Sequence, residues 1–360
     1  MKIGILTQHF YRNYGGIVQN YALQQVLIRL GHVPITFEHD TCYSRTRWAM
    51  RVIKQVVRRR NFKSLSEYPY KGRIGHRPFI DFVVDNISSV TVRNFTGEIE
   101  SVYGCEAFIV GSDQVWRPAF NQGRLYNMYL DFASNDVKKI AYAASFGVSD
   151  WEYTEKETQK CKSLVSRFDA VSVRENSGIE LCRTHLGVDV KWVLDPTLLL
   201  DSSDYEAVCQ NVSVGDKFVF VYALHLNDEM QDYAQQIANQ LGLNVKILQA
   251  GNRLKPEDTI EKWLASFRDA EAVVTDSFHG MAFSVIFNKP FHIFKNESGG
   301  VARYESLLKQ LGIENRIVMN KANINTQTIN WEAVNRKRQE LKQDSIEFLN
   351  QELSCKQKSQ

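Results

Sequence analysis

The sequence predicts an α/β protein in which two Rossmann-like, parallel-sheet domains face each other across a cleft. Its 360 residues exceed the usual size of a single hydrophobic core, so two domains are expected. Short apolar runs alternate along the chain with helical patterns, which is typical of parallel strands joined by crossover helices. The alternation pauses near Asp195-Pro196 and resumes after a loop around 201–215. We therefore expect domains at 1–200 and 201–325.

The first series of elements opens with a strand and an amphipathic helix. Apolar residues at helical spacing predict a helix over Ile17–Leu30, which Gly31 ends. Further helices are expected at 154–167 and 175–186. The predicted strands are Lys2–Thr7, Val33–Glu38, Ala107–Val110, Ile140–Ala144, Ala170–Val173 and Val190–Leu194.

The second series repeats this alternation and ends in a long charged helix over Trp331–Leu353, which we expect to pack back on the N-terminal domain as a separate segment, 326–360. The predicted strands are Lys217–Leu224, Val245–Ala250, Ala272–Thr275 and Pro290–Phe294, and the predicted helices are Asp228–Leu241, Glu257–Arg268, Met281–Phe287 and Arg303–Leu311.

Composition predicts a soluble, cytoplasmic protein. The formal net charge of +3 is too small to indicate a nucleic-acid partner. Six cysteines, at 42, 105, 161, 182, 209 and 355, form no CxxC pair, which argues against a zinc site and for reduced thiols. The N-terminus lacks the apolar core of a signal peptide, and no run reaches the ~18 apolar residues of a spanning helix. We expect no metal and no cofactor.

The most informative segment is 272–281, in which the strand AVVT runs into Asp276 and Ser277, and His279-Gly280 opens a helix. Backbone N–H groups at a helix start bind anions, and Gly280 permits close approach. A histidine at this point can pair with an anion and donate a proton. The alternative is that Asp276 or Ser277 caps the helix while His279 packs.

Two glycines follow the first predicted strand in the segment 13–20, at the turn where many α/β enzymes approach a ligand. The segment is neither GxGxxG nor a P-loop, so it does not indicate nicotinamide or ATP. Its candidate binding residues are Asn13, Gly15, Gly16 and Gln19; a tight turn without a ligand is the alternative.

Polar side chains also follow two other predicted strands. Ser112, Asp113 and Gln114 end the strand at 107–110, where short polar groups suit sugar hydroxyls, although a simple turn would use them too. Arg174 ends the strand at 170–173, where a guanidinium can hold a carboxylate or phosphate or pair with an acid such as Glu175.

In this order the four segments resemble the polysaccharide pyruvyl transferase family, over roughly residues 1–312. NYGGIVQNYALQ is similar to the family's glycine turn and first helix, GSDQVW, VSVREN and DPTLL to its middle motifs, and TDSFHG to its serine-x-x-His-Gly signature. The resemblance implies a fold like that of GT-B glycosyltransferases. It also implies transfer of the enolpyruvyl group of phosphoenolpyruvate to a sugar of a cell-surface polysaccharide, such as a capsule or exopolysaccharide, or its lipid-linked precursor. The acceptor is then expected on the N-terminal domain and the donor on the C-terminal one.

The resemblance also implies roles for single residues. His279 matches the family's essential histidine, which would protonate the donor's methylene carbon, and Arg174 matches its anion-binding arginine. The family often has a lysine about twenty positions after the histidine. Because Gly299 stands there, Lys295 and Arg303 are the nearest candidates for the third cationic contact. Asp113 and Asp276 both remain candidates for the base.

A basic, amphipathic stretch at 45–63 carries eight Arg or Lys residues and no acid. It fits peripheral contact with an anionic membrane surface, at the inner face of the cell membrane. The sequence favours the alternative, a solvated helix whose apolar face packs on the first domain, and the stretch has no aromatic-rich motif of the kind that binds nucleic acid.

Two other functions stay open on the sequence alone. A glycosyltransferase that uses a nucleotide sugar would share the fold, and Glu297 and Glu305 have the E-x7-E spacing of some retaining members. A glycan-binding protein without catalysis would have no need of His279 or Arg174.

Overall fold

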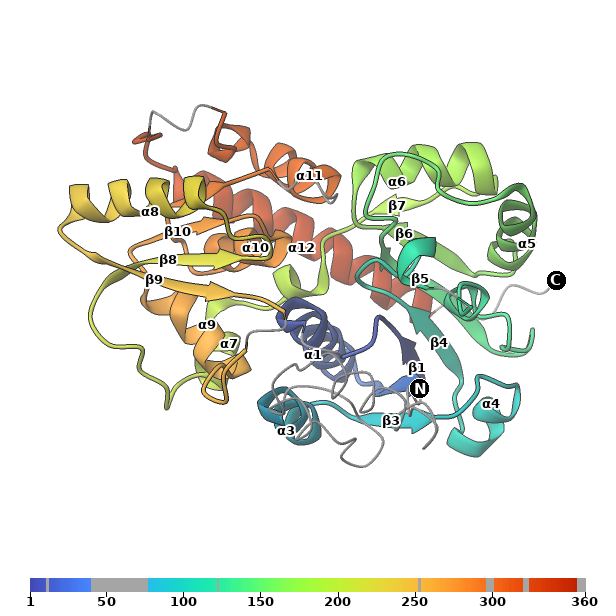
Figure 1. Cartoon of the computed structure of the whole chain (residues 1–360). Helices are drawn as coiled ribbons and strands as arrows, with labels where there is room; N and C mark the ends of the chain where they lie inside the picture. The colour runs from blue at the N-terminus through green and yellow to red at the C-terminus, as the bar shows by residue number, and fades with distance from the viewer. Residues whose placement is uncertain are drawn as a thin grey trace, which may run out of the picture.

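The computed structural model describes residues 1–10, 13–39, 77–121, 123–251, 254–295, 301–319 and 324–354. The chain forms two α/β lobes, with the long helix α12 (Trp331–Ser354) running along both (Figure 1). The predicted basic stretch at 45–63 lies outside the described residues. No helix in the described part of the chain is long and apolar enough to cross a membrane.

The first lobe is built on a seven-stranded sheet with the order β3-β2-β1-β4-β5-β6-β7. Every neighbouring pair of strands is parallel. The strands are β1 (Lys2–Leu6), β2 (Val33–His39), β3 (Ser89–Val92), β4 (Ala107–Val110), β5 (Lys138–Ala144), β6 (Ala170–Val173) and β7 (Lys191–Trp192).

Both faces of this sheet are covered, so its central strands are apolar throughout. Along β4, Ala107 and Ile109 belong to one core, while Phe108 and Val110 belong to the core on the opposite face. This alternation follows from the two-residue period of a strand. The helices of this lobe are α1 (Tyr14–Arg29), α3 (Arg77–Asn86), α4 (Glu98–Tyr103), α5 (Glu155–Val165) and α6 (Asn176–Leu181).

The second lobe has a four-stranded parallel sheet with the order β11-β10-β8-β9. Its strands are β8 (Phe218–Ala223), β9 (Asn244–Gln249), β10 (Ala272–Thr275) and β11 (Phe291–Ile293). Its helices are α7 (Ser202–Val208), α8 (Asp228–Leu241), α9 (Ile260–Asp269), α10 (Phe278–Ile286) and α11 (Val301–Leu311). The predicted α/β fold with two parallel-sheet units is therefore confirmed.

The two lobes share one continuous apolar core. Residues of the first sheet, such as Ile5, and residues of the second, such as Phe220, belong to the same cluster of buried side chains. Helices α6 and α11 also meet across the boundary, where the Asn176 backbone N–H donates to Ser306 Oγ at 3.1 Å (Figure 1). The lobes are thus packed on each other rather than tethered by a linker.

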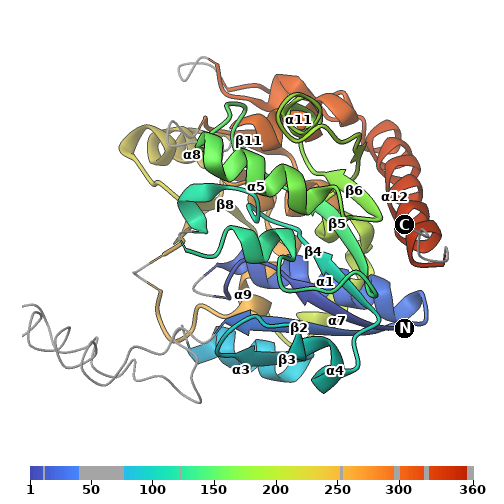
Figure 2. The ribbon, with the colours of Figure 1, turned by 90° about the vertical axis from the view of Figure 1, so that its right-hand side faces the viewer.

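Helix α12 contacts the first lobe beside β5 (Figure 2). Lys138 Nζ donates to the Glu352 carbonyl oxygen at 2.6 Å, and the Leu194 backbone N–H donates to Ser345 Oγ at 3.0 Å. Its apolar residues Phe348 and Leu349 are buried in the shared core. The C-terminal helix therefore returns to the N-terminal sheet.

Some elements differ from the sequence expectation. Helix α7 lies in the stretch expected as a loop, where Asp201 and Asp204 make a capping box. Helix α10 begins at Phe278 rather than Met281, because Ser277 caps it. Helix α3 and strand β3 were not predicted.

Candidate active site

A cavity of about 540 Å³ lies where the two lobes face each other. Its walls come from the segments after the carboxyl ends of β1, β4, β8, β9 and β10, and from α11, as expected for ligand sites in parallel α/β folds. The lining residues are Asn13, Asp113, Gln114, Phe120, Tyr222, Leu224, His225, Ala250, Gly251, Ser277, Phe278, His279 and Arg303.

The turn from β10 into α10 is fixed by its own polar groups. Ser277 Oγ accepts the Gly280 backbone N–H at 3.4 Å, so it caps the helix. A side chain on Gly280 would run into Thr275. Asp276 accepts the backbone N–H groups of Leu224 (2.6 Å) and His225 (2.8 Å). The Asp276 carboxylate thus holds the loop after β8, while the capping alternative applies to Ser277.

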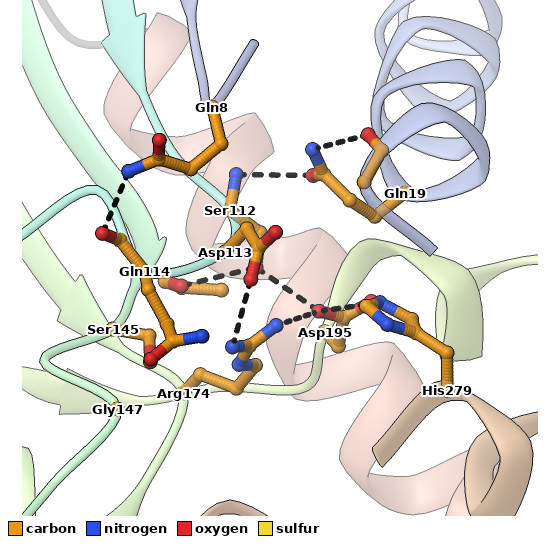
Figure 3. Close-up of polar contacts among 12 residues, drawn as sticks. Gln8, Gln19, Ser112, Asp113, Gln114, Ser145, Gly147, Arg174, Asp195 and His279 are labelled. Carbon is orange, nitrogen blue, oxygen red and sulfur yellow. Dashed lines mark hydrogen bonds and ion pairs between the residues drawn. The ribbon is translucent and has the colours of Figure 1, made fainter. Parts of the chain in front are cut away.

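His279 lies in the first turn of α10 and is only 6% exposed. Its Nε2 is 4.0 Å from Asp195 Oδ2 and has no hydrogen-bond partner within the described part of the chain (Figure 3). The imidazole lies directly against Gly15, where a Cβ would be 2.5 Å from His279 Cε1 and closer still to Nδ1 and Cγ. Burial lowers the pKa of His279, and the nearby Asp195 and Asp113 carboxylates partly offset this effect.

Asp195 connects the first lobe to His279. Its Oδ2 accepts Arg174 Nη1 at 2.7 Å and Ser112 Oγ at 3.0 Å, while Oδ1 accepts the backbone N–H (3.0 Å) and Oγ1 (2.8 Å) of Thr197. Burial alone would raise the pKa of Asp195, but Arg174 and His279 hold it below its ordinary value. Asp195 is therefore a buried anion beside the candidate catalytic histidine.

Arg174 lies behind the cavity wall, among three carboxylates. Besides Asp195, its guanidinium is 3.5 Å from Asp113 Oδ1 and 3.8 Å from Glu175 Oε2. Its Cζ is 4.7 Å from the centroid of the Phe278 ring. The side chain is 1% exposed, so it pairs with acids, the alternative that the sequence left open. The nearest acid is Asp195 rather than Glu175.

The two candidates for the third cation differ in position. Lys295 Nζ is 3.2 Å from Glu305 Oε1, and both side chains are nearly half exposed. Arg303 lines the cavity, and its buried Nε has no hydrogen-bond partner among the described residues. Burial, with a smaller effect from Arg174, lowers the pKa of Arg303 to about 10, so it stays charged at neutral pH. Arg303 is thus the cation that faces the cavity.

The other predicted residues of the first lobe form the opposite wall and its support. Asp113 and Gln114 line the cavity, and Asn13 Nδ2 is 3.4 Å from Asp113 Oδ2. Gln19 is fully buried: its Nε2 donates to Thr7 and Gly16, and its Oε1 accepts the Ser112 backbone N–H at 3.2 Å. Figure 3 shows the bond between Gln19 and Ser112, next to Asp113.

Residues at or beside the cavity that were not predicted from the sequence include Asp195, Tyr222, His225 and Phe120. Asp195 was part of the DPTLL motif, and a buried strand followed by Asp-Pro was the signal for it. Tyr222 and His225 stand at the carboxyl end of β8. Ligands bind at the carboxyl ends of parallel strands, so the argument made for β4 and β10 could have found these two residues as well. Phe120 lies in a short 3₁₀ turn with no such signal.

Neither a metal site nor a glutamate pair is evident in the described residues. No group of three or more His, Cys, Asp or Glu side chains in the described ranges is arranged to hold a metal ion. Glu305 is on the surface with Lys295, and Glu297 lies outside the described ranges.

A sequence model of the polysaccharide pyruvyl transferase family matches residues 13–298, which include all four motif segments and His279. The chain belongs to this family. Membership makes this pyruvyl transferase homologue a transferase, and a glycan acceptor is consistent with the family. A search of curated proteins with the sequence finds no significant match.

Several solved structures are similar in fold to this pyruvyl transferase family member. Staphylococcus aureus MnaA with UDP is 12% identical, with 98% of this chain and 91% of that chain covered and a TM-score of 0.49. Arabidopsis thaliana UGT89C1 with UDP-L-rhamnose is 7% identical, with 98% and 99% covered and a TM-score of 0.49. A Thermobaculum terrenum O-GlcNAc transferase mutant is 10% identical, with 98% and 66% covered and a TM-score of 0.41. At these identities the likeness concerns fold alone.

Proposed function

We propose that this enzyme transfers the enolpyruvyl group of phosphoenolpyruvate to a sugar of a cell-surface polysaccharide, or of its lipid-linked precursor, and closes a pyruvyl ketal. The observation that carries the proposal is the pairing of His279 and Arg303 in one interlobe cavity, in a chain of this family. No organic cofactor is needed for this chemistry.

The donor carries a phosphate and a carboxylate, so its site requires cations and N–H donors. Arg303 offers a charged guanidinium whose Nε has no partner among the described residues. The N-terminus of α10 lies in the same wall and favours negative charge. A cavity of about 540 Å³ is of the size that small-molecule sites have. These groups support the binding of a small dianionic or trianionic ligand beside His279.

The reaction would begin with proton transfer from His279 to the methylene carbon of phosphoenolpyruvate. The adjacent carbon then becomes electron-poor and is attacked by a sugar hydroxyl, whose proton leaves to a base. Asp113 is the candidate base, since it lines the cavity and Asp276 is occupied by backbone N–H groups. A second hydroxyl of the sugar then attacks the same carbon, its proton passes to the departing inorganic phosphate, and the ketal closes.

His279 must gain a proton before it can donate one. Its lowered pKa makes it neutral at pH 7 without ligand. A bound anion would favour the imidazolium, because an opposite charge within a few ångströms raises the pKa of a histidine. Proton uptake is therefore expected on donor binding.

Calorimetry with the full chain tests the proposal. Phosphoenolpyruvate is titrated in Hepes and in Tris, whose different ionisation enthalpies reveal the number of protons taken up. We expect binding with proton uptake in the wild type, binding without uptake in His279→Asn, and weakened binding in Arg303→Ala. Lys295→Ala is the matched control, because its cation lies outside the cavity.

Two results would refute the proposal. If phosphoenolpyruvate does not bind but a nucleotide sugar from a parallel panel does, the enzyme is a glycosyltransferase on the same fold. If neither binds and a glycan alone does, the protein is a glycan-binding one. An acceptor screen that follows phosphate release completes the test.

A further inference from the structure

Phe120 is an exposed aromatic side chain in the wall of an otherwise largely polar part of the cavity. It is 53% exposed, although it lines the cavity together with Asp113 and Gln114. Single exposed apolar residues are ordinary on protein surfaces and need no explanation. This one differs because it stands beside hydrogen-bonding groups in a concave site, and because the surrounding residues hold it in place.

One side of the Phe120 ring is supported by Arg117. The guanidinium Cζ lies 5.1 Å from the ring centroid, a cation–π arrangement. Arg117 is fixed in turn by two contacts with Glu152, at 3.2 and 3.3 Å, and by a bond from Nη1 to Gln114 Oε1 at 3.2 Å. The ring and the Gln114 amide are therefore linked through one guanidinium. Gln114 lines the cavity, where its amide N–H groups can donate to a ligand.

The backbone that carries Phe120 is fixed as well. Asn121 is 3% exposed, and its Nδ2 donates to the carbonyl oxygens of Val115 (2.8 Å) and Arg117 (2.9 Å). Its Oδ1 accepts Gln8 Nε2 at 3.1 Å, and the same Gln8 amide donates to the Gln114 carbonyl oxygen at 2.8 Å (Figure 3). Pro118 starts the turn and restricts its backbone. A ring held in this way loses little conformational entropy when it binds a ligand.

We propose that Phe120 is the stacking platform for the pyranose ring of the acceptor, with Gln114 and Asp113 as hydrogen-bond partners of its hydroxyls. A pyranoside has one face of C–H groups, weakly positive, and a rim of hydroxyls. The negative face of an aromatic ring and adjacent amide and carboxylate groups complement those two features. The inference rests on the proposed function, and it places the acceptor on the first lobe, opposite His279 and Arg303.

Saturation-transfer NMR on the full chain tests this platform without the donor. The probes are methyl β-galactopyranoside, methyl β-glucopyranoside and methyl N-acetyl-β-glucosaminide. We expect transfer from the protein to the C–H hydrogens of one ring face of at least one probe. Phe120→Ala should weaken the binding of that probe roughly tenfold, the equivalent of losing about half of a buried aromatic contact. Phe120→Trp should retain it.

Val102→Ala is the matched control, since Val102 is 70% exposed on the same lobe but does not line the cavity. The inference is wrong if no probe binds the wild type, if Phe120→Ala binds as well as the wild type, or if Val102→Ala is equally weakened. Phosphoenolpyruvate affinity, measured in parallel, should not change in Phe120→Ala. If the wild-type protein does not bind phosphoenolpyruvate, the proposed function is refuted. The sugar-binding result would still test whether Phe120 is a stacking platform.

Discussion

Gly15→Ala tests whether contact between the two lobes sets the position of the candidate catalytic histidine. The new Cβ would be 2.5 Å from His279 Cε1, and nearer to two other ring atoms. Carbon atoms in contact prefer about 3.5–4.0 Å, so the imidazole would have to retreat by about 1 Å or more. The 4.0 Å approach of His279 Nε2 to Asp195 Oδ2 would then change. A displacement of this size costs on the order of 100-fold in rate.

The effect on folding should be much smaller. Overpacking typically costs about 1–3 kcal/mol, while alanine is favoured over glycine in a helix by about 1 kcal/mol. We therefore expect kcat to fall about 100-fold with a loss of stability of at most about 2 kcal/mol.

The assay follows phosphate release with saturating phosphoenolpyruvate and acceptor, beside urea unfolding of the same preparation. Gly97→Ala serves as the control, because a Cβ there meets only the Phe132 carbonyl oxygen at 3.6 Å, an ordinary contact. A Gly15→Ala enzyme with wild-type kcat would show that the close packing on His279 is not needed for catalysis. If Gly15→Ala instead loses activity only because it unfolds, the expectation of a small effect on folding is wrong.

Three further predictions concern charge. Arg303→Ala should weaken phosphoenolpyruvate binding about 10- to 100-fold by calorimetry, whereas Lys295→Ala should change it less than about twofold; equal losses would contradict the assignment. Asp195→Asn removes the carboxylate that raises the pKa of His279. The alkaline limb of the pH profile of kcat/KM should therefore move to lower pH. An unmoved limb would exclude an effect of Asp195 on the pKa of His279. His292 is buried, and burial lowers its pKa to about 4 from an ordinary 6.5. Between these two pH values the unfolded chain binds more protons than the folded one. The free energy of unfolding should therefore fall as the pH drops from 6.5 to 4, by at most about 3 kcal/mol. Urea unfolding at pH 7 and 4.5 measures this loss, and a His292→Gln variant with an unchanged pH dependence would contradict it.

Much of the fold could be predicted because apolar strands in parallel sheets have a strong local signal. Ala107–Val110, Ala170–Val173 and Ala272–Thr275 occur with the predicted bounds. Helix α7 was missed since its evidence is a capping box, Asp201 with Asp204, rather than an apolar stripe. Strands that are buried on both faces of a sheet are therefore easier to predict from the sequence than a short helix defined by its cap.

The site was predicted less completely, because neighbouring motif residues do not reveal their partners. The sequence identified Arg174 as a candidate anion-binding residue, yet two carboxylates from distant segments, Asp113 and Asp195, join the adjacent Glu175 around it in space. Likewise, the choice between Lys295 and Arg303 depends on which of the two side chains faces the cavity in the folded chain. Gly15 was expected to admit a ligand, whereas its missing side chain admits the His279 ring.

The contact between Gly15 and His279 also limits how such proteins can be recombined. The histidine belongs to one lobe, while the surface beneath it and the Asp195 carboxylate beside it come from the segment 1–200. A chimera that joins the first lobe of one homologue to the second lobe of another must keep these pairings together. If the junction alters either, the hybrid will fold around its shared core and still lack a positioned imidazole. Exchange of acceptor or donor specificity between homologues is therefore better pursued by replacing cavity residues within one chain than by exchanging whole lobes.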